Sequence, residues 1–324
     1  MTTCWILSED KAGMINQCLG LAEALGVVPL RKVLRVRAPW RYLPPSLWFN
    51  ARAAPGPGSD PLTPPWPDLL IGSGHGSVAL SIAIRRASGG RTYTVQIQDP
   101  RVHRSRFGLV VVPEHDRCRG ANVLVTRGAL HRVTPARLAV AASCAAPALA
   151  SQPRPLVAVL LGGSNRVYRF TEDAAVRLAE QLLALHHALG VGIAVTPSRR
   201  TPPRVLAVLR ERLAPAGATI WDGRGENPYF GYLALADFLL VTADSVSMVS
   251  EACSTGRPVY VVPLAGGSRK FRAFHFSLER AGITRPFCGQ LETWSYGPLR
   301  ETDTVAAEVR RRLQCAGSIP GVEG

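Results

Sequence analysis

A glycine-rich turn separates an apolar run from a helical pattern in the second half of the 324-residue chain. The apolar residues 157–161 are followed by four turn residues, Gly162, Gly163, Ser164 and Asn165. Glycines that follow a strand let backbone N–H groups approach an anion, and Ser164 adds a hydroxyl donor. The turn lacks the Gly-Lys-Ser/Thr of a Walker loop and the spacing of a dinucleotide fingerprint. It predicts a phosphate contact, with an ordinary strand–helix turn as the alternative.

A second polar turn follows the apolar residues 238–241. Asp244 and Ser245 are candidate caps of a helix that continues through Ser247 to Glu251. A capped helix start offers free N–H donors and the positive end of the helix dipole. Glu251 lies about two turns further along, where a carboxylate can accept both hydroxyls of a ribose. The alternative for Glu251 is a solvated helix glutamate.

Two groups of basic residues add possible anion contacts. Arg199 and Arg200 follow the apolar residues 192–196 and are candidate phosphate clamps, because arginine stays charged and binds in a bidentate manner. Residues 30–49 mix five basic and four aromatic side chains: Arg31, Lys32, Arg35, Arg37, Arg41, Trp40, Tyr42, Trp48 and Phe49. This mixture favours contact with an anionic bilayer or a phospholipid-linked acceptor. An edge strand covered by a loop is the alternative.

The composition favours anionic partners and excludes several protein classes. The chain has 38 Lys and Arg against 23 Asp and Glu, a net charge of +15. Nucleic acid is a weak prediction, because no helix-turn-helix, zinc-ligand or RNA-motif pattern accompanies the charge. The seven cysteines are scattered without metal-ligand spacing, so no metal site is predicted. With no signal peptide and no apolar run of about 18 residues, we expect a cytoplasmic protein, peripheral to a membrane at most.

Short apolar runs alternate with helical patterns along both halves of the chain. The pattern predicts an α/β protein with two doubly wound, Rossmann-like domains that face a cleft, with ligands at the carboxyl ends of the strands. The small-residue stretch 139–155 is the predicted join. We therefore predict a first domain over residues 1–150 and a second over residues 151–324.

The two polar turns resemble the nucleotide-sugar half of GT-B glycosyltransferases, in particular the enzyme that adds N-acetylglucosamine to lipid-linked peptidoglycan precursors. That half opens on a Gly-Gly-Ser loop and carries a serine-rich turn with a downstream glutamate. The resemblance implies that Gly162, Gly163 and Ser164 approach the phosphates. It also implies that Ser245 and Ser247 bind diphosphate or sugar and that Glu251 holds the ribose.

A longer resemblance covers nearly the whole chain. The motifs that carry it include DKAG with NQ (10–17), VTPSRRTP (195–202), WDGRGENPYFGYLALAD (221–237) and TADSVSMVSEACSTGRPVYV (242–261). They are similar to the mitochondrial-fission "elongated mitochondria" family, which includes bacterial members of unassigned activity. Where members commonly read Lys-Ala-Gly-His-Glu, this chain has Met14-Ile15. Where they commonly read Gly-Arg-Arg, it has Gly74-His75-Gly76.

Together these patterns predict a metal-independent transferase that uses a nucleotide-diphosphate sugar and needs no other cofactor. Asp99 is the preferred general base for the acceptor hydroxyl, followed by His75 and Asp10, because all three follow predicted strands of the first domain. An Asx turn before Pro100 is the alternative for Asp99. The alternatives for the whole protein are a sugar-nucleotide epimerase and a non-catalytic adaptor that docks at membranes.

Overall fold

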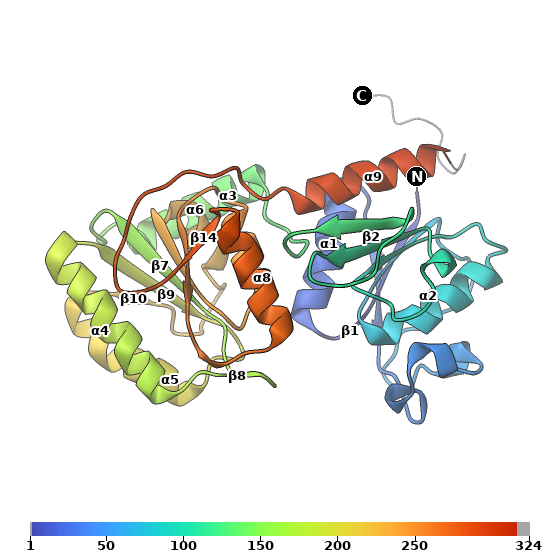
Figure 1. Cartoon of the computed structure of the whole chain (residues 1–324), viewed down its shortest axis with the longest axis horizontal. Helices are drawn as coiled ribbons and strands as arrows, with labels where there is room; N and C mark the ends of the chain where they lie inside the picture. Colours follow the sequence, from blue (N-terminus) through green and yellow to red (C-terminus); the bar gives the residue numbers. More distant parts are fainter. Residues whose placement is uncertain (1, 316–324) are drawn as a thin grey trace. The chain divides into compact units, whose positions relative to one another are not determined.

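The computed structural model describes residues 2–315, which form two compact α/β units. The first unit comprises residues 2–132 together with residues 300–315, and the second comprises Val133–Leu299. Each unit is built on a six-stranded sheet whose neighbouring strands are all parallel (Figure 1). The predicted α/β class with two doubly wound, Rossmann-like domains is confirmed.

The first unit has the strand order β2-β1-β3-β4-β5-β6. Its strands are β1 (Cys4–Glu9), β2 (Pro29–Leu34), β3 (Leu69–Ser73), β4 (Tyr93–Ile97), β5 (Leu109–Pro113) and β6 (Val123–Thr126). Its helices are α1 (Ala12–Leu25), α2 (His75–Ala87) and α9 (Glu301–Cys315), with short 3-10 turns η1 (Trp40–Tyr42), η2 (Pro45–Leu47), η3 (Ala51–Ala53) and η4 (Arg104–Arg106).

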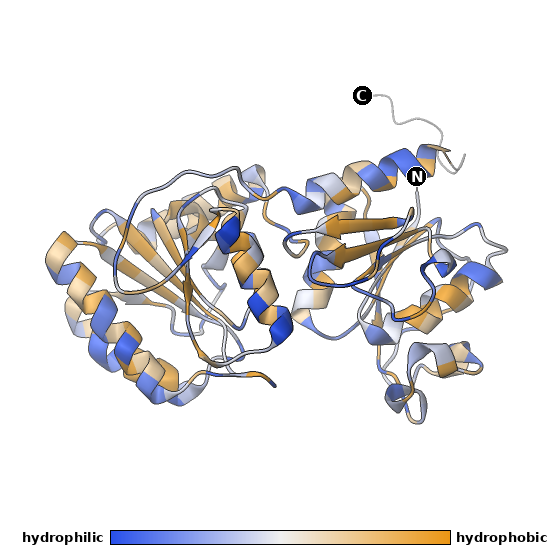
Figure 2. Cartoon of the chain, viewed as in Figure 1, coloured by the Kyte–Doolittle hydropathy of each residue, from blue (hydrophilic) through white to orange (hydrophobic). Residues whose placement is uncertain are grey.

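Side chains of β1 alternate between two apolar cores. Cys4 and Ile6 pack with α1 and α9, whereas Trp5 and Leu7 pack with α2 and the loop that precedes β3. Alternate residues of a strand point to opposite faces, so a continuous apolar run requires cover on both faces. Figure 2 shows the strands of both sheets as largely hydrophobic.

The C-terminal helix α9 belongs to the first unit. Val305, Ala306 and Val309 are buried in the same core as α1. The start of α9 is fixed by Thr302, whose hydroxyl accepts from the His131 amide at 3.0 Å and donates to the His131 carbonyl at 3.1 Å. Gly20 on α1 permits this packing, because a Cβ there would lie 2.2 Å from the His131 carbonyl oxygen. The core of the first unit therefore contains residues from near both ends of the described chain.

The units differ from the predicted domains 1–150 and 151–324. The predicted join, 139–155, is mostly helix: α3 spans Pro135–Leu149. The Thr134 hydroxyl caps this helix by accepting from the Arg137 amide at 3.1 Å, and proline occupies the first helical turn. Alanine is the strongest helix former, so a small-residue stretch rich in alanine favours a helix over a linker. The chain passes into the second unit before α3.

The second unit has the strand order β10-β9-β7-β11-β12-β14 and a separate antiparallel pair, β8 with β13. Its strands are β7 (Leu156–Leu161), β8 (Tyr168–Arg169), β9 (Gly192–Pro197), β10 (Thr219–Ile220), β11 (Phe238–Thr242), β12 (Val259–Val262), β13 (Ala265–Gly266) and β14 (Thr284–Pro286). Its helices are α3, α4 (Glu172–Leu189), α5 (Pro203–Leu213), α6 (Tyr229–Leu235), α7 (Val246–Cys253) and α8 (Arg269–Arg280), with the 3-10 turn η5 (Ala214–Ala216).

The strand β7 lies at the centre of this unit and is buried on both faces. Val157, Val159 and Leu161 pack with α4 and α5, and the intervening residues pack with α3, α6, α7 and α8. The unit is therefore a three-layer sandwich. Because helices cover both faces of the sheet, a ligand can approach it at the ends of the strands. Within residues 2–315, no helix has the length and apolar composition needed to cross a bilayer.

The assignment of α9 to the first unit makes a testable prediction. Val309→Asp places an unpaired carboxylate in the core shared with α1, which should cost more than about 3 kcal/mol of stability. Hydrogen exchange should accelerate in peptides of α1, β1 and β3 and stay unchanged in β7 and α4. Val140→Asp on α3, where the side chain is 68% exposed, is the matched control. Equal acceleration in both units would contradict the division.

Candidate functional site

The strand order of the second unit reverses between β7 and β11. The chain first adds β9 and β10 on one side of β7, and then β11, β12 and β14 on the other. Ligands of open parallel sheets bind outside the carboxyl ends of the strands at such a switch point. Both polar turns singled out in the sequence lie there, since Gly162–Asn165 follows β7 and Asp244–Ser247 follows β11. The structure therefore brings the two turns together.

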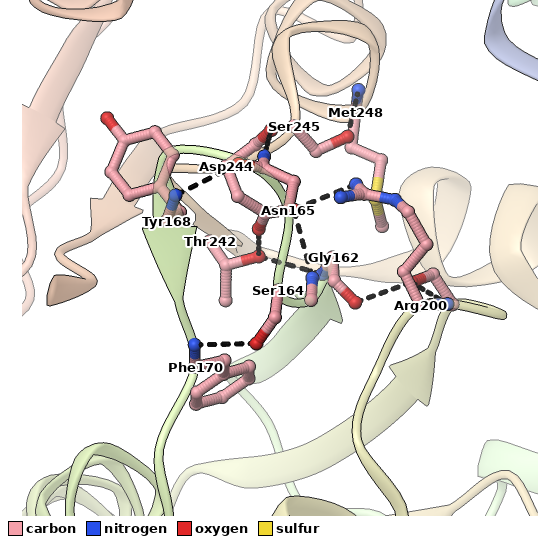
Figure 3. Close-up of polar contacts among 12 residues, drawn as sticks. Gly162, Ser164, Asn165, Tyr168, Phe170, Arg200, Thr242, Asp244, Ser245 and Met248 are labelled. Atoms are coloured by element: carbon pink, nitrogen blue, oxygen red, sulfur yellow. Dashed lines mark hydrogen bonds and ion pairs between the residues drawn. The ribbon is translucent and has the colours of Figure 1, made fainter. Parts of the chain in front are cut away.

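The Asp244 carboxylate joins these two turns. Its side chain is fully buried, and its Oδ2 accepts from the Gly163 amide at 2.9 Å and from Arg200 Nη2 at 2.8 Å. Its Oδ1 accepts from the Thr242 hydroxyl at 2.7 Å (Figure 3). The Thr242 oxygen in turn accepts from the Gly162 amide at 2.7 Å. Asp244 was predicted as a helix cap, but its carboxylate instead fixes the β7 turn, and Ser245 is the cap.

The two glycines are required by close packing within the protein. A Cβ at Gly162 would lie 2.2 Å from Asp244 Oδ1, and a Cβ at Gly163 would lie 2.0 Å from the Arg200 carbonyl oxygen. No larger residue fits either position without moving the buried carboxylate or the backbone. The amides of Gly162 and Gly163 are already engaged by Thr242 and Asp244, so their predicted contact with phosphate requires rearrangement.

Ser164 and Asn165 shape the rest of the turn. The Ser164 hydroxyl accepts from the Phe170 amide at 3.0 Å, and its side chain is exposed. Asn165 Oδ1 accepts from the amides of Val167 and Tyr168 at 2.8 and 2.9 Å. Asn165 is therefore occupied with holding the turn, whereas Ser164 keeps its hydroxyl proton for a ligand.

The start of α7 presents unused backbone donors. Ser245 Oγ accepts from the Met248 amide at 3.4 Å, which confirms Ser245 as the helix cap. No hydrogen bond among the described residues engages the amides of Val246 or Ser247. Ser247 is half-buried beside them. Free amides at a helix start attract negative charge.

Glu251 forms a buried pair with Tyr229 from α6. The Tyr229 hydroxyl donates to Glu251 Oε2 at 2.5 Å, and Glu251 is only 6% exposed. Asn227 orients the tyrosine by accepting from its backbone amide at 3.0 Å. The solvated-glutamate alternative is therefore wrong. The predicted ribose contact stays a prediction, and it would use the carboxylate oxygen that Tyr229 does not occupy.

Burial sets the ionisation of this pair. Burial raises the pKa of Glu251 to about 7, although the Tyr229 hydrogen bond opposes the shift. The pKa of Tyr229 is raised well above its usual value, first by burial and then by the neighbouring carboxylate. Near neutral pH Glu251 is thus divided between its charged and neutral forms, and a ligand that donates hydroxyl groups would favour the charged form.

The two neighbouring candidate arginines differ in their contacts. Arg200 pairs with Asp244 while its side chain stays 43% exposed, whereas Arg199 is exposed with no hydrogen bond or ion pair among the described residues. Arg199 is free to reach a ligand, and its role stays a prediction. The adjacent pair in the sequence gave no signal to distinguish the structural arginine from the free one.

A cavity of about 200 Å³ adjoins the β11 turn within the second unit. Its lining includes Tyr168, Ala243, His275, Glu279 and Arg285. His275 Nε2 donates to the Ala243 carbonyl at 2.8 Å, and its buried Nδ1 has no partner within residues 2–315. Burial lowers the pKa of His275, which favours the neutral ring with Nδ1 unprotonated. Sequence reasoning missed this histidine because α8 carries no motif that marks it.

The first unit has its own switch point, between β1 and β3. Glu9 at the end of β1 accepts from the Gly76 amide at 3.3 Å and from Lys11 Nζ at 2.5 Å. Asp10 is exposed and pairs with Arg31 at 2.8 Å. His75 begins α2, and partial burial lowers its pKa against the opposing charge of Glu9. The predicted residues Asp10 and His75 therefore follow adjacent strands of this sheet.

The two departures from the "elongated mitochondria" pattern are neighbours in the structure. A Cβ built on Gly74, whose φ is +86°, would lie 2.6 Å from Met14 Sδ. Ile15 is buried at 8% exposure. Met14 therefore packs against Gly74, the residue directly before the replaced positions His75 and Gly76.

Asp99 follows β4, one strand beyond β3 in the sheet. Its Oδ1 accepts from the Arg101 amide at 2.9 Å, and Gln98 and Arg101 both have positive φ angles, 76° and 55°. The Asx-turn alternative is therefore confirmed. Because that turn uses only one carboxylate oxygen and Asp99 is half-exposed, its role as a base stays a prediction. Among residues 2–315, no group of three or more His, Cys, Asp and Glu is placed to hold a metal ion.

Two solved structures share this fold over most of the chain. The UDP-GlcNAc 2-epimerase of Methanocaldococcus jannaschii has a TM-score of 0.57 at 10% identity and covers 95% of this chain and 99% of its own. The UDP-GlcNAc 2-epimerase of Neisseria meningitidis, bound to UDP-GlcNAc, has a TM-score of 0.51 at 12% identity over 98% and 92%. The fold of the chain is therefore that of these two epimerases.

The sequence comparisons agree with the longer resemblance. The "Mitochondrial fission protein ELM1" of Arabidopsis thaliana is 36% identical over 278 residues, which cover 78% of this chain and 65% of the plant protein. This chain thus spans just under two thirds of its plant relative. An uncharacterized protein of Rickettsia prowazekii is 26% identical over 96% of this chain and 98% of its own. Residues 12–313 match the family described as Mitochondrial fission ELM1, and the chain therefore belongs to that family.

Proposed function

We propose that the chain is a metal-independent transferase that takes its sugar from a nucleotide diphosphate bound at the carboxyl ends of β7 and β11. The observation that carries the proposal is the set of unused donors at this switch point. They are the amides of Val246 and Ser247 and the hydroxyl of exposed Ser164. Fixed donors of this kind stabilise the charge that develops on a leaving diphosphate without a metal.

The neighbouring groups suit the remaining parts of such a donor. Glu251 is proposed to accept the ribose hydroxyls, with Tyr229 holding its carboxylate in place. The cavity beside Ala243 is lined by His275, Glu279 and Arg285, and we propose that their side chains contact the sugar hydroxyls. The bound UDP-GlcNAc of the Neisseria epimerase, and the UDP-glucose of a Medicago truncatula protein with a TM-score of 0.50, support a uridine nucleotide as the first donor to test.

In this proposal Asp99 takes the proton of the acceptor hydroxyl, with His75 and Asp10 as the next candidates. The acceptor would be membrane-associated or phosphorylated, in keeping with the net charge of +15. A sugar-nucleotide epimerase is the second candidate, because the structure with a TM-score of 0.57 is one. The two differ in products, since an epimerase converts UDP-GlcNAc without any acceptor.

Calorimetric titration with UDP-GlcNAc tests the donor site. Glu251→Gln should weaken binding by roughly 10- to 100-fold, because a hydrogen bond to a charged group contributes about 1.5–3 kcal/mol. The melting temperature should remain close to that of the parent, since Gln keeps an acceptor for Tyr229. Glu172→Gln, on an exposed first-turn residue of the same unit, is the matched control. Unchanged affinity in Glu251→Gln would reject the ribose assignment.

The pH dependence of binding gives an independent test of Glu251. Its pKa near 7 means that the carboxyl gains a proton as pH falls through 7 and loses an acceptor, so affinity should fall by up to about tenfold per pH unit. Binding by Glu251→Gln should be flat over the same range. Tyr229→Phe should move the midpoint upward, because the tyrosine hydrogen bond lowers the Glu251 pKa. A parent titration without a midpoint near 7 would count against this role.

Hydrolysis of UDP-GlcNAc, with water as the acceptor, tests Asp99. Asp99→Asn keeps an oxygen that can accept from the Arg101 amide, so the turn should survive. Turnover should fall by roughly 100- to 10,000-fold with donor affinity nearly preserved, because a base acts only as the proton leaves. Asp222→Asn is the matched control, since Asp222 forms the same kind of turn with the Arg224 amide at 2.8 Å. Normal turnover in Asp99→Asn would place the base elsewhere, and donor binding without any turnover in the parent would favour the adaptor.

A further inference from the structure

A loop of the first unit presents large apolar side chains to solvent. This loop, residues 37–54, contains the turns η1, η2 and η3 and lies beside α2, where it forms the blue segment of Figure 1. Tyr42, Leu47 and Phe49 are 70%, 61% and 62% exposed. Three such residues within eight positions are unusual on a soluble surface and mark a contact site.

The loop is held in a defined conformation. Trp40 Nε1 donates to the Phe49 carbonyl at 2.8 Å, and Trp48 Nε1 donates to the Leu43 carbonyl at 3.0 Å. Both indole rings are buried in the core beneath α2, at 7% and 9% exposure. The two tryptophans that the sequence grouped with interfacial aromatics are therefore structural anchors. The buried tryptophans thus fix the backbone that carries the exposed side chains of Tyr42, Leu47 and Phe49.

The loop and the residues that flank it in the sequence carry only positive charge. Residues 24–59 contain six basic and no acidic residues, and all five arginines are exposed: Arg31, Arg35, Arg37, Arg41 and Arg52. The Arg41 guanidinium lies 4.5 Å from the centroid of the Tyr42 ring. Apolar and aromatic tips flanked by arginine suit a surface that is anionic at its boundary and apolar below it.

We infer that the 37–54 loop docks the protein on an anionic bilayer surface. A second copy of the chain is a poor occupant, because a symmetric contact would face the arginines with one another. Single-stranded nucleic acid would match the charge, but Leu47 offers no ring on which a base could stack. The inference does not depend on the nucleotide site, which lies in the second unit.

Vesicle sedimentation with the full chain tests the inference. The protein should sediment with vesicles that contain phosphatidylserine in phosphatidylcholine and remain in solution with phosphatidylcholine alone. Raising salt from about 0.1 M to about 1 M shortens the Debye length from about 10 Å to about 3 Å and should release most of it. Equal retention on neutral and anionic vesicles would overturn the charge-based part of the inference.

Two matched pairs of variants locate the contact. Leu47→Ser with Phe49→Ser should reduce retention at every salt concentration, whereas Leu189→Ser with Phe276→Ser should not. The control residues are 53% and 62% exposed but lie in the second unit. Arg41→Gln with Arg52→Gln should lower the partition coefficient roughly 30-fold, because each basic residue contributes about 1 kcal/mol. Arg204→Gln with Arg300→Gln makes the same change in net charge and should have little effect.

The variants also separate the rival outcomes. Thermal unfolding should be unchanged in all four, since none of the altered side chains is buried. Equal losses in the loop variants and their controls would show that net charge, not the loop, binds the vesicles. Retention on single-stranded RNA with none on anionic vesicles would replace the bilayer with nucleic acid and overturn the inference.

Discussion

A buried carboxylate organises the candidate site. Asp244 lies where β11 ends, and a charge at that depth is tolerated only with strong partners. Arg200, the Gly163 amide and the Thr242 hydroxyl supply them. Loss of one partner from a buried ion pair costs about 3–5 kcal/mol, and the lower end applies here because Arg200 is itself partly exposed. The turn after β7 must therefore approach β11 closely, which only glycine at 162 and 163 permits.

This constraint links the fold to the proposed chemistry. Because Thr242 and Asp244 engage the two glycine amides, the donors left for a diphosphate are those at the start of α7 and the Ser164 hydroxyl. Arg200 balances the buried charge, which leaves Arg199 as the exposed cation of the pair. The site thus separates groups that hold its shape from groups that remain open to a ligand. Glu251 combines both roles, because one of its carboxylate oxygens accepts from Tyr229 and the proposal assigns the other to the ligand.

Much of this arrangement could be predicted from local sequence patterns. Helix α4 has its end signals in the local sequence, because Thr171 caps its start, Glu172 lies in its first turn and Gly190 ends it in the left-handed conformation. The position of both polar turns followed from their place after apolar strands. The pairing of Asp244 with Arg200 and of Glu251 with Tyr229 joins residues 44 and 22 positions apart. No periodicity or motif encodes such distant contacts, so their partners could not be found.

Composition gives a wrong prediction where the same residue type is typical of two different structural roles. The sequence of α3 has the small residues of a linker, but its alanines also have high helix propensity. The Thr134 cap is the local signal that favours the helix. Trp40, Trp48 and Phe49 belong to the same basic segment. The two tryptophans are buried anchors and Phe49 is exposed, a difference that the sequence pattern does not reveal. Helix α9 returns to the first unit through Thr302 and His131, a contact across 171 positions.

Hydrogen exchange measured with and without UDP-GlcNAc tests the central claim most directly. If the nucleotide sugar binds at the ends of β7 and β11, exchange should slow in peptides that cover residues 162–170 and 244–251, where free amides and the turn around Asp244 meet the ligand. Peptides of α4 and α5, on the covered face of the sheet, should not change. Saturating UDP-GlcNAc that leaves both turns unprotected, or protects only other segments, would contradict the claim.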